Sequence, residues 1–308
     1  MSLSKKIRSL FPPRARVEPQ LRIVRRTRIP GGERWLIGYQ TAPRERVSAF
    51  LLVPNTGGDR VPAILASHQH NGEFGVGKSE TAGLGGDPEM AYGLELFQRG
   101  YVVLCPDHLG FEDRQQKAAQ NRFPRAGKSY EHFLFADEIL KGGSLAARYL
   151  FDLQQALDVL EQLSFVDAGR LGAIGHSLGG QTAVWLAAMD RRIHVAFSSC
   201  GFGTLRSIQR RQIPHNCAMY LPGLMRVGDM DDVITSIAPR AFGMCHGAAD
   251  ANFPVSGVRQ IHARAKRSFP KEQLFQRIFP GGHAFPPRLR AQAYIFMDHH
   301  LGIRANRV

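Results

Sequence analysis

Long apolar runs are missing from this sequence. No window of about 18 consecutive apolar residues occurs among its 308 residues, which argues against a membrane-spanning helix. The N-terminal stretch MSLSKKIRSLFPPRARVEPQ has basic residues but neither an apolar segment nor a small-residue cleavage site, so we expect no secretory signal. Arg25 and Arg26 are not followed by an apolar run, as a twin-arginine export signal would require. We therefore expect a soluble, cytoplasmic protein.

Cysteine is also scarce. The four thiols form no C-x-x-C pair and no spacing typical of a disulfide framework; they are Cys105, Cys200, Cys217 and Cys245. Cys105 and Cys245 each end an apolar run, which favours buried thiols in a reducing compartment.

Acidic residues are too few to balance the basic ones, and the formal net charge is +14. Residues 1–34 hold ten Lys or Arg against Glu18 and Glu33, so the excess is concentrated in a basic N-terminal arm, residues 1–30. No aromatic residues alternate with these basic ones, which argues against nucleic-acid binding. We expect the arm to be solvated or to contact a second copy of the chain in a homo-oligomer; docking on an anionic surface is the alternative.

Hydrophobic residues make up 44% of the chain and charged residues 21%, enough for a large core in a single domain over residues 31–308. Two alternating segments, 33–41 and 46–54, read as an antiparallel pair. After them, short apolar runs alternate with amphipathic segments. The expected strands are 61–68, 101–107, 170–175, 192–199, 240–247 and 274–279. The expected helices are 87–100, 144–163, 177–189, 254–267 and 287–301. This alternation predicts an α/β fold with a mostly parallel central sheet flanked by helices.

Two short motifs point to different chemistries. Residues 72–79 read GEFGVGKS, which matches the G-x-x-x-x-G-K-[ST] loop that holds nucleotide phosphates. Residues 175–180 read GHSLGG, which matches the G-x-S-x-G turn that exposes a nucleophilic serine. We do not expect a chain of this size to use both.

The phosphate-loop match lacks its structural context. A phosphate loop needs a helix that begins near its Lys-Ser pair. A helix through Lys78 would instead meet three glycines, at about 1 kcal/mol each, and then a proline: Gly83, Gly85, Gly86 and Pro88. The run VVLCPD, which imitates a magnesium-binding acidic strand, keeps a nucleotide hydrolase as an alternative.

The serine motif has its context. A strand (RLGAIG) precedes Ser177 and a helix (QTAVWLAAM) follows it. Asp250 and His283 then follow two later strands, in the order serine, acid, histidine that this architecture uses. Both lie at the carboxyl ends of strands, where active sites of parallel sheets assemble. The pattern predicts a catalytic triad in which His283 transfers the proton of Ser177 and Asp250 orients the imidazole.

Together these stretches resemble an α/β-hydrolase of the dienelactone-hydrolase and acetyl-xylan-esterase-like group. The matching stretches are HQHNGEFGVGKSE, RGYVVLCPDHLGFEDR, VDAGRLGAIGHSLGGQTAVWLAA, APRAFGMCHGAADANFP and GGHAF, within residues 60–300. The resemblance implies a Ser-His-Asp hydrolase of carboxylic esters that needs no cofactor. True dienelactone hydrolases have a cysteine nucleophile where this chain has Ser177, which argues against a dienelactone substrate.

The resemblance also assigns the opening motif to the oxyanion side of the site. Backbone N–H groups of Leu178 and of Gln69 or His70 are the expected oxyanion donors. The excursions 108–143 and 200–239 are expected to line or cover the pocket. Their aromatic residues predict a moderately apolar lining: Phe111, Phe123, Tyr130, Phe133, Phe135, Phe202 and Tyr220.

Other polar residues have simpler interpretations. His68 and His70, two residues apart with no third ligand nearby, are a weak metal pair, so we expect no metal. His176, His299 and His300 fit packing or surface positions, and Asp107 with Arg114 fits a brace within a loop. Three other acids could replace Asp250 if the triad acid belongs to an earlier strand: Asp229, Asp231 and Asp232.

The sequence thus favours a serine carboxylic-ester hydrolase acting on a small-molecule ester, with deacetylation of acetylated sugars as one form of it. A serine peptidase or a thioesterase uses the same triad and stays open. We expect no propeller-sized N-terminal domain, which argues against an oligopeptidase. A catalytically silent hydrolase used for binding is disfavoured by the intact triad residues.

Overall fold

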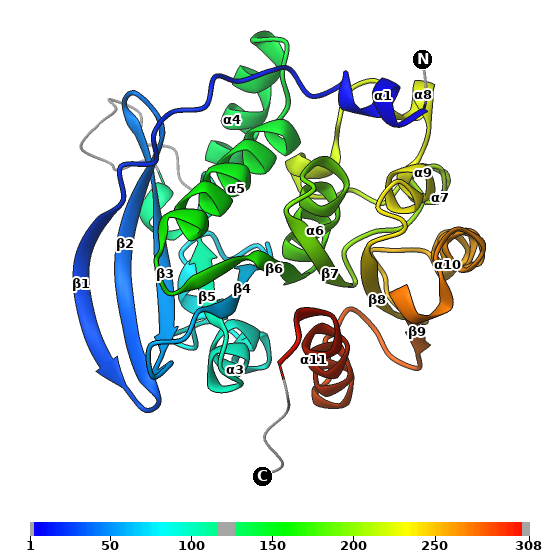
Figure 1. Ribbon diagram of the computed structural model, residues 1–308. Coiled ribbons are helices and arrows are strands. Elements are labelled where there is room, and N and C mark those ends of the chain that lie inside the picture. Colours follow the sequence, from blue (N-terminus) through cyan, green and yellow to red (C-terminus); the bar gives the residue numbers. More distant parts are fainter. Residues whose placement is uncertain (1–2, 116–126, 304–308) are drawn as a thin grey trace.

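A computed structural model describes residues 3–115 and 127–303. These residues form one nine-stranded sheet in the order β1-β2-β3-β5-β4-β6-β7-β8-β9 (Figure 1). The strands β1, β2, β3 and β5 pair antiparallel, and the pairs from β5 through β9 are parallel. This confirms the predicted mostly parallel α/β sheet.

From β2 on, the strand bounds agree with the predicted runs to within one residue, except that β6 begins at Val166 and not at residue 170. The strands are β1 (Arg22–Ile29), β2 (Gly32–Ala42), β3 (Glu45–Pro54), β4 (Val61–Ser67), β5 (Val102–Pro106), β6 (Val166–His176), β7 (Ile193–Ser199), β8 (Ala241–Gly247) and β9 (Leu274–Phe279). The central strands β4 and β5 are almost wholly buried, as expected for strands covered by helices on both faces.

Helices cover both faces of the sheet. The longer ones are α3 (Tyr92–Gln98), α4 (Lys128–Leu140), α5 (Leu145–Gln162), α6 (Leu178–Met189), α10 (Val255–Ser268) and α11 (Pro287–Leu301). The short ones are α1 (Leu3–Arg8), α2 (Lys78–Thr81), α7 (Leu205–Arg210), α8 (Leu224–Val227) and α9 (Met230–Thr235), with 3-10 turns η1 (Pro88–Met90), η2 (Glu112–Arg114), η4 (Cys217–Met219) and η5 (Lys271–Gln273). In Figure 1, α3 and α11 lie below the sheet, and α5 and α6 lie above it.

The core has two main parts, one on each face of the sheet. One contains α5, α6 and α10 side chains such as Leu157, Val184 and Ile261, packed on the inner residues of the strands. The other contains α3 and α11 side chains such as Leu96 and Met297. Among the helices that the structure describes, none combines the length and the apolar character needed to cross a bilayer.

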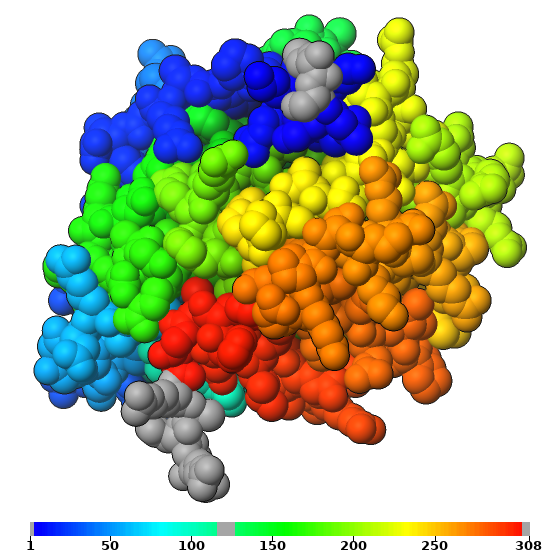
Figure 2. Space-filling model, turned by 45° about the vertical axis from the view of Figure 1, so that its right-hand side comes forward, coloured from blue at the N-terminus to red at the C-terminus, as the bar shows by residue number. Residues whose placement is uncertain are grey.

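The N-terminal arm is part of the fold, and most of its residues are exposed to solvent. Its residues 22–29 form β1, the edge strand of the sheet, so the sheet extends into the segment that the sequence assigned to the arm. The residues before β1 run across α5 and α6. Figure 2 shows this segment, in blue, lying against the green and yellow parts of the chain.

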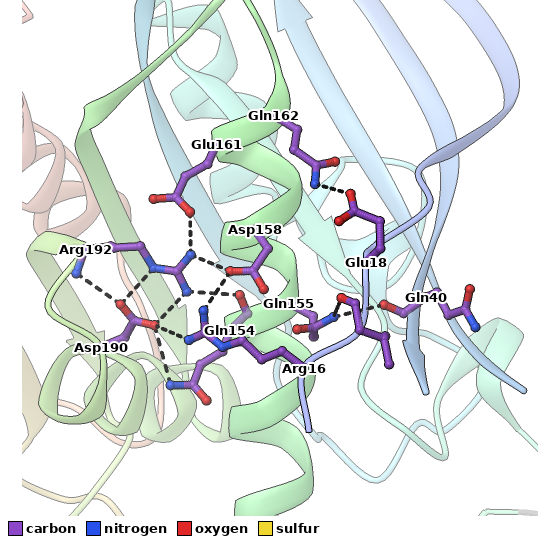
Figure 3. Close-up of polar contacts among 11 residues, drawn as sticks. Arg16, Glu18, Gln40, Gln154, Gln155, Asp158, Glu161, Gln162, Asp190 and Arg192 are labelled. Carbon is purple, nitrogen blue, oxygen red and sulfur yellow. Dashed lines mark hydrogen bonds and ion pairs between the residues drawn. The ribbon is translucent and has the colours of Figure 1, made fainter. Parts of the chain in front are cut away.

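Ion pairs and hydrogen bonds fix the arm on these helices. Arg8 donates to the Met189 and Ala188 carbonyl oxygens at 2.8 and 2.7 Å. Farther along, Arg16 pairs with Asp158 at 3.2 Å beside an Arg192 cluster, as Figure 3 shows. Glu18 accepts from Gln162 at 2.8 Å, also visible in Figure 3. Arg8 and Arg16 of the basic arm are therefore bound to carbonyl oxygens and an acidic group of the body.

The two excursions contain more regular structure than their composition predicts. Residues 128–140 of the first form the 13-residue helix α4, and residues 205–235 of the second contain three short helices and a 3-10 turn. Phe123, expected near the pocket, lies outside the described residues.

Candidate active site

Ser177 lies on a sharp turn between β6 and α6. Its backbone has φ 53° and ψ −119°, an unusual conformation for a residue other than glycine. Two glycines make the turn possible, because a Cβ on Gly175 would lie 2.1 Å from the Gly179 carbonyl carbon, and one on Gly179 would lie 1.9 Å from the Ser67 oxygen. The hydroxyl therefore stands at the N-terminus of a 12-residue helix, where the helix dipole favours negative charge.

Asp250 and His283 lie together, as the sequence predicts. Asp250 Oδ2 accepts a hydrogen bond from His283 Nδ1 at 2.8 Å, and the Asp250 side chain is fully buried. Its other oxygen accepts from the backbone N–H groups of Asn252 and Phe253 at 2.8 and 3.3 Å. With Nδ1 donating to the carboxylate, the His283 Nε2 atom carries the lone pair that a general base needs.

Ser177 and His283 line the same pocket, which has a volume of about 280 Å³. Within the described residues, the Ser177 Oγ atom makes no hydrogen bond, so the serine and the histidine are adjacent but not directly bonded. Such contacts are commonly long without substrate and tighten in the complex. The lining residues are Gln69, His70, Asn71, Gly72, Ser177, Pro214, His215, Asn216, Asn252 and His283.

Of the predicted oxyanion residues, two line this pocket and the third directly follows Ser177. Gln69 and His70 line it, and Leu178 is the first residue of α6. The His70 ring is held by the protein: its Nδ1 accepts from the Gly72 N–H at 3.1 Å, and its Nε2 contacts the Glu131 carboxylate at 3.2 Å. This fixes the loop in which the second oxyanion donor is expected.

The prediction of a moderately apolar pocket is wrong. Every lining residue except Gly72 and Pro214 has a polar side chain. The aromatic residues of the excursions pack elsewhere; for instance, Phe111 and Phe202 are fully buried in separate clusters. No sequence pattern selects His215, Asn216 or Asn252, because their placement depends on how the chain folds back over the strand ends.

The competing acids have other partners. Asp229 caps α9 and accepts from the Leu205 N–H at 2.6 Å. Asp231 and Asp232 both pair with Arg264, at 2.9 and 2.5 Å. These contacts account for all three carboxylates, and among the four candidate acids Asp250 is the one bonded to His283.

The residues of the phosphate-loop motif bind the protein's own carboxylates. Backbone N–H groups of Gly77 and Ser79 both donate to Glu112 Oε2 at 2.9 Å, and the Lys78 N–H donates to Asp107 Oδ1 at 2.7 Å. The Lys78 ammonium, almost fully buried, contacts Asp107 at 2.9 Å and Glu112 at 2.6 Å. The motif therefore forms a small anion-binding loop whose anions belong to the chain itself.

This arrangement modifies two sequence interpretations. A helix does begin at Lys78, but α2 ends at Thr81, before the glycines that would interrupt it. Asp107 braces the loop through Lys78, while Arg114 pairs with Asp152 at 2.8 Å and also donates to the Asp107 carbonyl oxygen.

His68 and His70 are not a free metal pair, because contacts within the protein use both nitrogens of each ring. His68 Nδ1 donates to the Gln69 carbonyl at 2.7 Å, and its Nε2 accepts from the His108 N–H at 3.1 Å. Burial lowers the pKa of His68 to about 4, so the ring is neutral near pH 7. Among the described residues, one group of three side chains has its possible metal-ligand atoms within 4.8 Å of one another. These side chains belong to Cys200, Asp250 and His283.

Solved structures share this fold. A glucuronoyl esterase from Solibacter usitatus superposes with a TM-score of 0.71 at 15% identity, covering 96% of this chain and 91% of that one. Acetyl xylan esterase 1 from Thermoanaerobacterium sp. JW/SL YS485 superposes with a TM-score of 0.64 at 17% identity, covering 96% and 90%. These matches confirm the α/β-hydrolase fold.

Sequence comparison identifies the family. The chain is 32% identical over 230 residues to a Bacillus subtilis (strain 168) protein named "Putative hydrolase YtaP", covering 73% of this chain and 71% of that protein. Residues 142–303, just over half of the chain, match the prolyl oligopeptidase family. With its α/β-hydrolase fold, the chain is a hydrolase that belongs to the prolyl oligopeptidase family.

Proposed function

We propose that this protein is a serine hydrolase of carboxylic esters whose catalytic triad is Ser177, His283 and Asp250. The observation that carries the proposal is the pairing of His283 Nδ1 with the buried Asp250 carboxylate, with His283 and Ser177 facing one pocket. The sharp turn at Ser177 and the order of the three residues along the chain support the same assignment.

Acylation follows from these positions. Ser177 Oγ attacks the ester carbonyl carbon as its proton passes to His283 Nε2, and Asp250 stabilises the imidazolium that forms. The tetrahedral intermediate then collapses, the bond to the alcohol oxygen breaks, and His283 returns the proton to the departing alcohol. An acyl group remains on Ser177.

Deacylation repeats these steps with water. His283 takes a proton from a water molecule that attacks the acyl carbon, and it returns this proton to Ser177 Oγ as the bond between that oxygen and the acyl carbon breaks, which releases the acid. In both steps the negative oxygen would accept hydrogen bonds from the Leu178 N–H and from the N–H of Gln69 or His70. Loss of one such donor typically slows turnover by about 10²–10³-fold.

The pocket favours small, polar esters. Its volume of about 280 Å³ falls slightly below the range of about 300–1,000 Å³ usual for ligand pockets, and its lining is polar. We infer a short acyl group such as acetyl on a hydrophilic alcohol, which includes deacetylation of acetylated sugars. Long acyl chains would find little apolar surface there.

Peptide hydrolysis is a second candidate, because the family that residues 142–303 match is named for an oligopeptidase. The same triad would serve, with His283 protonating a departing amine instead of an alcohol. Acyl p-nitroanilides and short peptide p-nitroanilides, assayed beside the esters, separate the two candidates.

The decisive experiment combines kinetics with covalent labelling. Wild type is expected to hydrolyse p-nitrophenyl acetate with a higher kcat/KM than the octanoate. Ser177→Ala should lower turnover by several powers of ten and abolish labelling by a fluorophosphonate, read by mass spectrometry. Ser164→Ala, a change at an exposed serine before β6, is the matched control and should behave as wild type. Ser177→Ala with more than about a tenth of wild-type activity would overturn the assignment.

A further inference from the structure

One wall of the pocket comes from residues 214–216, in the excursion between β7 and β8. His215 is held firmly in this wall. Its Nε2 contacts the Asn252 carbonyl oxygen at 2.9 Å, its ring lies 4.9 Å from that of Phe253, and its backbone N–H donates to the Tyr220 hydroxyl at 3.0 Å. The ring therefore has a fixed orientation next to the loop that carries Asp250.

The Asn252 contact also determines the tautomer of His215. A carbonyl oxygen can only accept, so the His215 Nε2 atom carries the hydrogen and Nδ1 carries a lone pair. Burial lowers the pKa of His215, and a positive charge on His283 lowers it further. The ring is thus neutral at pH 7, and it stays so while His283 is an imidazolium.

His215 Nδ1 differs from the other imidazole nitrogens in the pocket. Both nitrogens of His70 contact protein groups, and His283 uses Nδ1 for Asp250 and Nε2 for proton transfer. Within residues 3–115 and 127–303, the His215 Nδ1 atom has no hydrogen-bond partner, and it is not among the buried polar atoms that lack one. It is an accessible acceptor on a residue that lines the pocket.

We propose that His215 is a specificity-determining residue whose Nδ1 accepts a hydrogen bond from a hydroxyl group of the substrate, close to the ester bond. The protein then prefers esters of polyols to esters of plain alkanols of the same size. This inference rests on the proposed ester hydrolysis and adds to it a recognition group and a substrate feature.

The charges around the site select a neutral donor. A lone pair on Nδ1 would repel a substrate carboxylate, and a substrate ammonium would be repelled by the imidazolium that His283 becomes during catalysis. A hydroxyl avoids both costs. The amide side chains of Asn71, Asn216 and Asn252, also in the lining, can donate to or accept from further hydroxyl groups.

The test compares two acetates that differ by one hydroxyl. The substrates are 2-hydroxyethyl acetate and propyl acetate, followed in a pH-stat, with each kcat/KM divided by the hydroxide-catalysed rate constant of the same ester. One neutral hydrogen bond corresponds to a preference of about threefold to tenfold for the hydroxylated ester in wild type. His215→Phe keeps a ring against Phe253 but has no acceptor, and its ratio should fall to about one.

His215→Asn is the matched variant, since an amide oxygen near the Nδ1 position restores an acceptor. It should retain part of the preference even if His215→Phe does not fold. A wild-type ratio near one would overturn the inference while leaving ester hydrolysis intact, and so would an unchanged preference in folded His215→Phe. If wild type cleaves neither acetate, the proposed function fails, and this inference fails with it.

Discussion

Replacing Lys78 by methionine should destabilise the protein strongly without removing a catalytic group. The ammonium is almost fully buried and contacts three carboxylates, those of Asp107, Glu112 and Asp113. Methionine has a similar length but no charge, so two largely buried carboxylates would lose their cation. Removing one partner of a buried ion pair typically costs about 3–5 kcal/mol, because the remaining charge is left uncompensated. We expect a loss of that size in the free energy of unfolding at pH 8.

The loss should depend on pH. Burial raises the pKa of Asp107 to about 7, although Lys78 acts in the opposite direction. The folded protein therefore binds this proton more tightly than the unfolded chain, so Asp107 favours folding at low pH, and that contribution is lost as the pH rises toward 7. Without Lys78 the pKa of Asp107 rises further. The variant can then neutralise the carboxylate by taking up a proton, so its deficit should be smaller at pH 5 than at pH 8.

Urea unfolding at both pH values, followed by circular dichroism, measures this effect. Lys141→Met is the matched control: its partner Asp137 lies one helical turn away, and the lysine side chain is 62% exposed. This control should change stability by no more than about 0.5 kcal/mol. A loss below about 1 kcal/mol for Lys78→Met, or an equal loss at both pH values, would refute the reasoning. The folded variant should still hydrolyse esters, and calorimetry should detect no saturable ATP binding to wild type.

Four further outcomes are expected. Asp250→Asn and His283→Ala should each lower ester turnover, and neither loss should add to that of Ser177→Ala; near-normal Asp250→Asn beside inactive Asp229→Asn would show that the acid was misassigned. Gly179→Ala should give little folded, active protein, because its Cβ would lie 1.9 Å from the Ser67 oxygen, whereas Gly75→Ala has open space and should resemble wild type in a melting assay. Burial lowers the pKa of His262 to about 4, below the unfolded value near 6.5. The unfolded chain therefore takes up a proton first as the pH falls from 6.5 to 4, and the free energy of unfolding decreases over that range. His262→Leu should make this decrease smaller in urea titrations, and an unchanged dependence of the unfolding free energy on pH would contradict the prediction. Deleting residues 1–17 should lower the melting temperature by removing the Arg8 and Arg16 contacts but leave kcat unchanged; loss of turnover in a folded, shortened chain would mean that the arm influences the site.

The residues of the proposed triad could be predicted from the sequence because each follows a strand that its apolar run identifies. Ser177, Asp250 and His283 lie at the carboxyl ends of β6, β8 and β9, and a parallel sheet brings such ends together. The turn at Ser177 also has a local signature, since Gly175 and Gly179 are required by the close approach of their backbones. At Ser177 the local glycine pattern and the arrangement of the parallel strands thus predict the same position for the site.

The edge strand β1 was not predicted, for a physical reason. Its sequence RIVRRTRI carries arginines on both faces, and its residues are mostly exposed, so it lacks the alternation of a half-buried strand. Charged side chains suit an edge, where they discourage pairing with other chains. The polar wall of the pocket was not predicted either. His215 and Asn216 reach the pocket because the excursion between β7 and β8 folds back over it, and no local sequence periodicity signals this placement.

The docking of the arm on α6 has a consequence for the order of folding. Arg8 is synthesised before the carbonyl oxygens that it binds, which belong to residues 180 and 181 positions later in the chain. At about 5–20 residues per second, that interval lasts roughly ten to forty seconds. The arm therefore cannot dock through Arg8 until α6 has been synthesised and packed on the sheet. At this end of the chain, the order of synthesis and the order of assembly run in opposite directions.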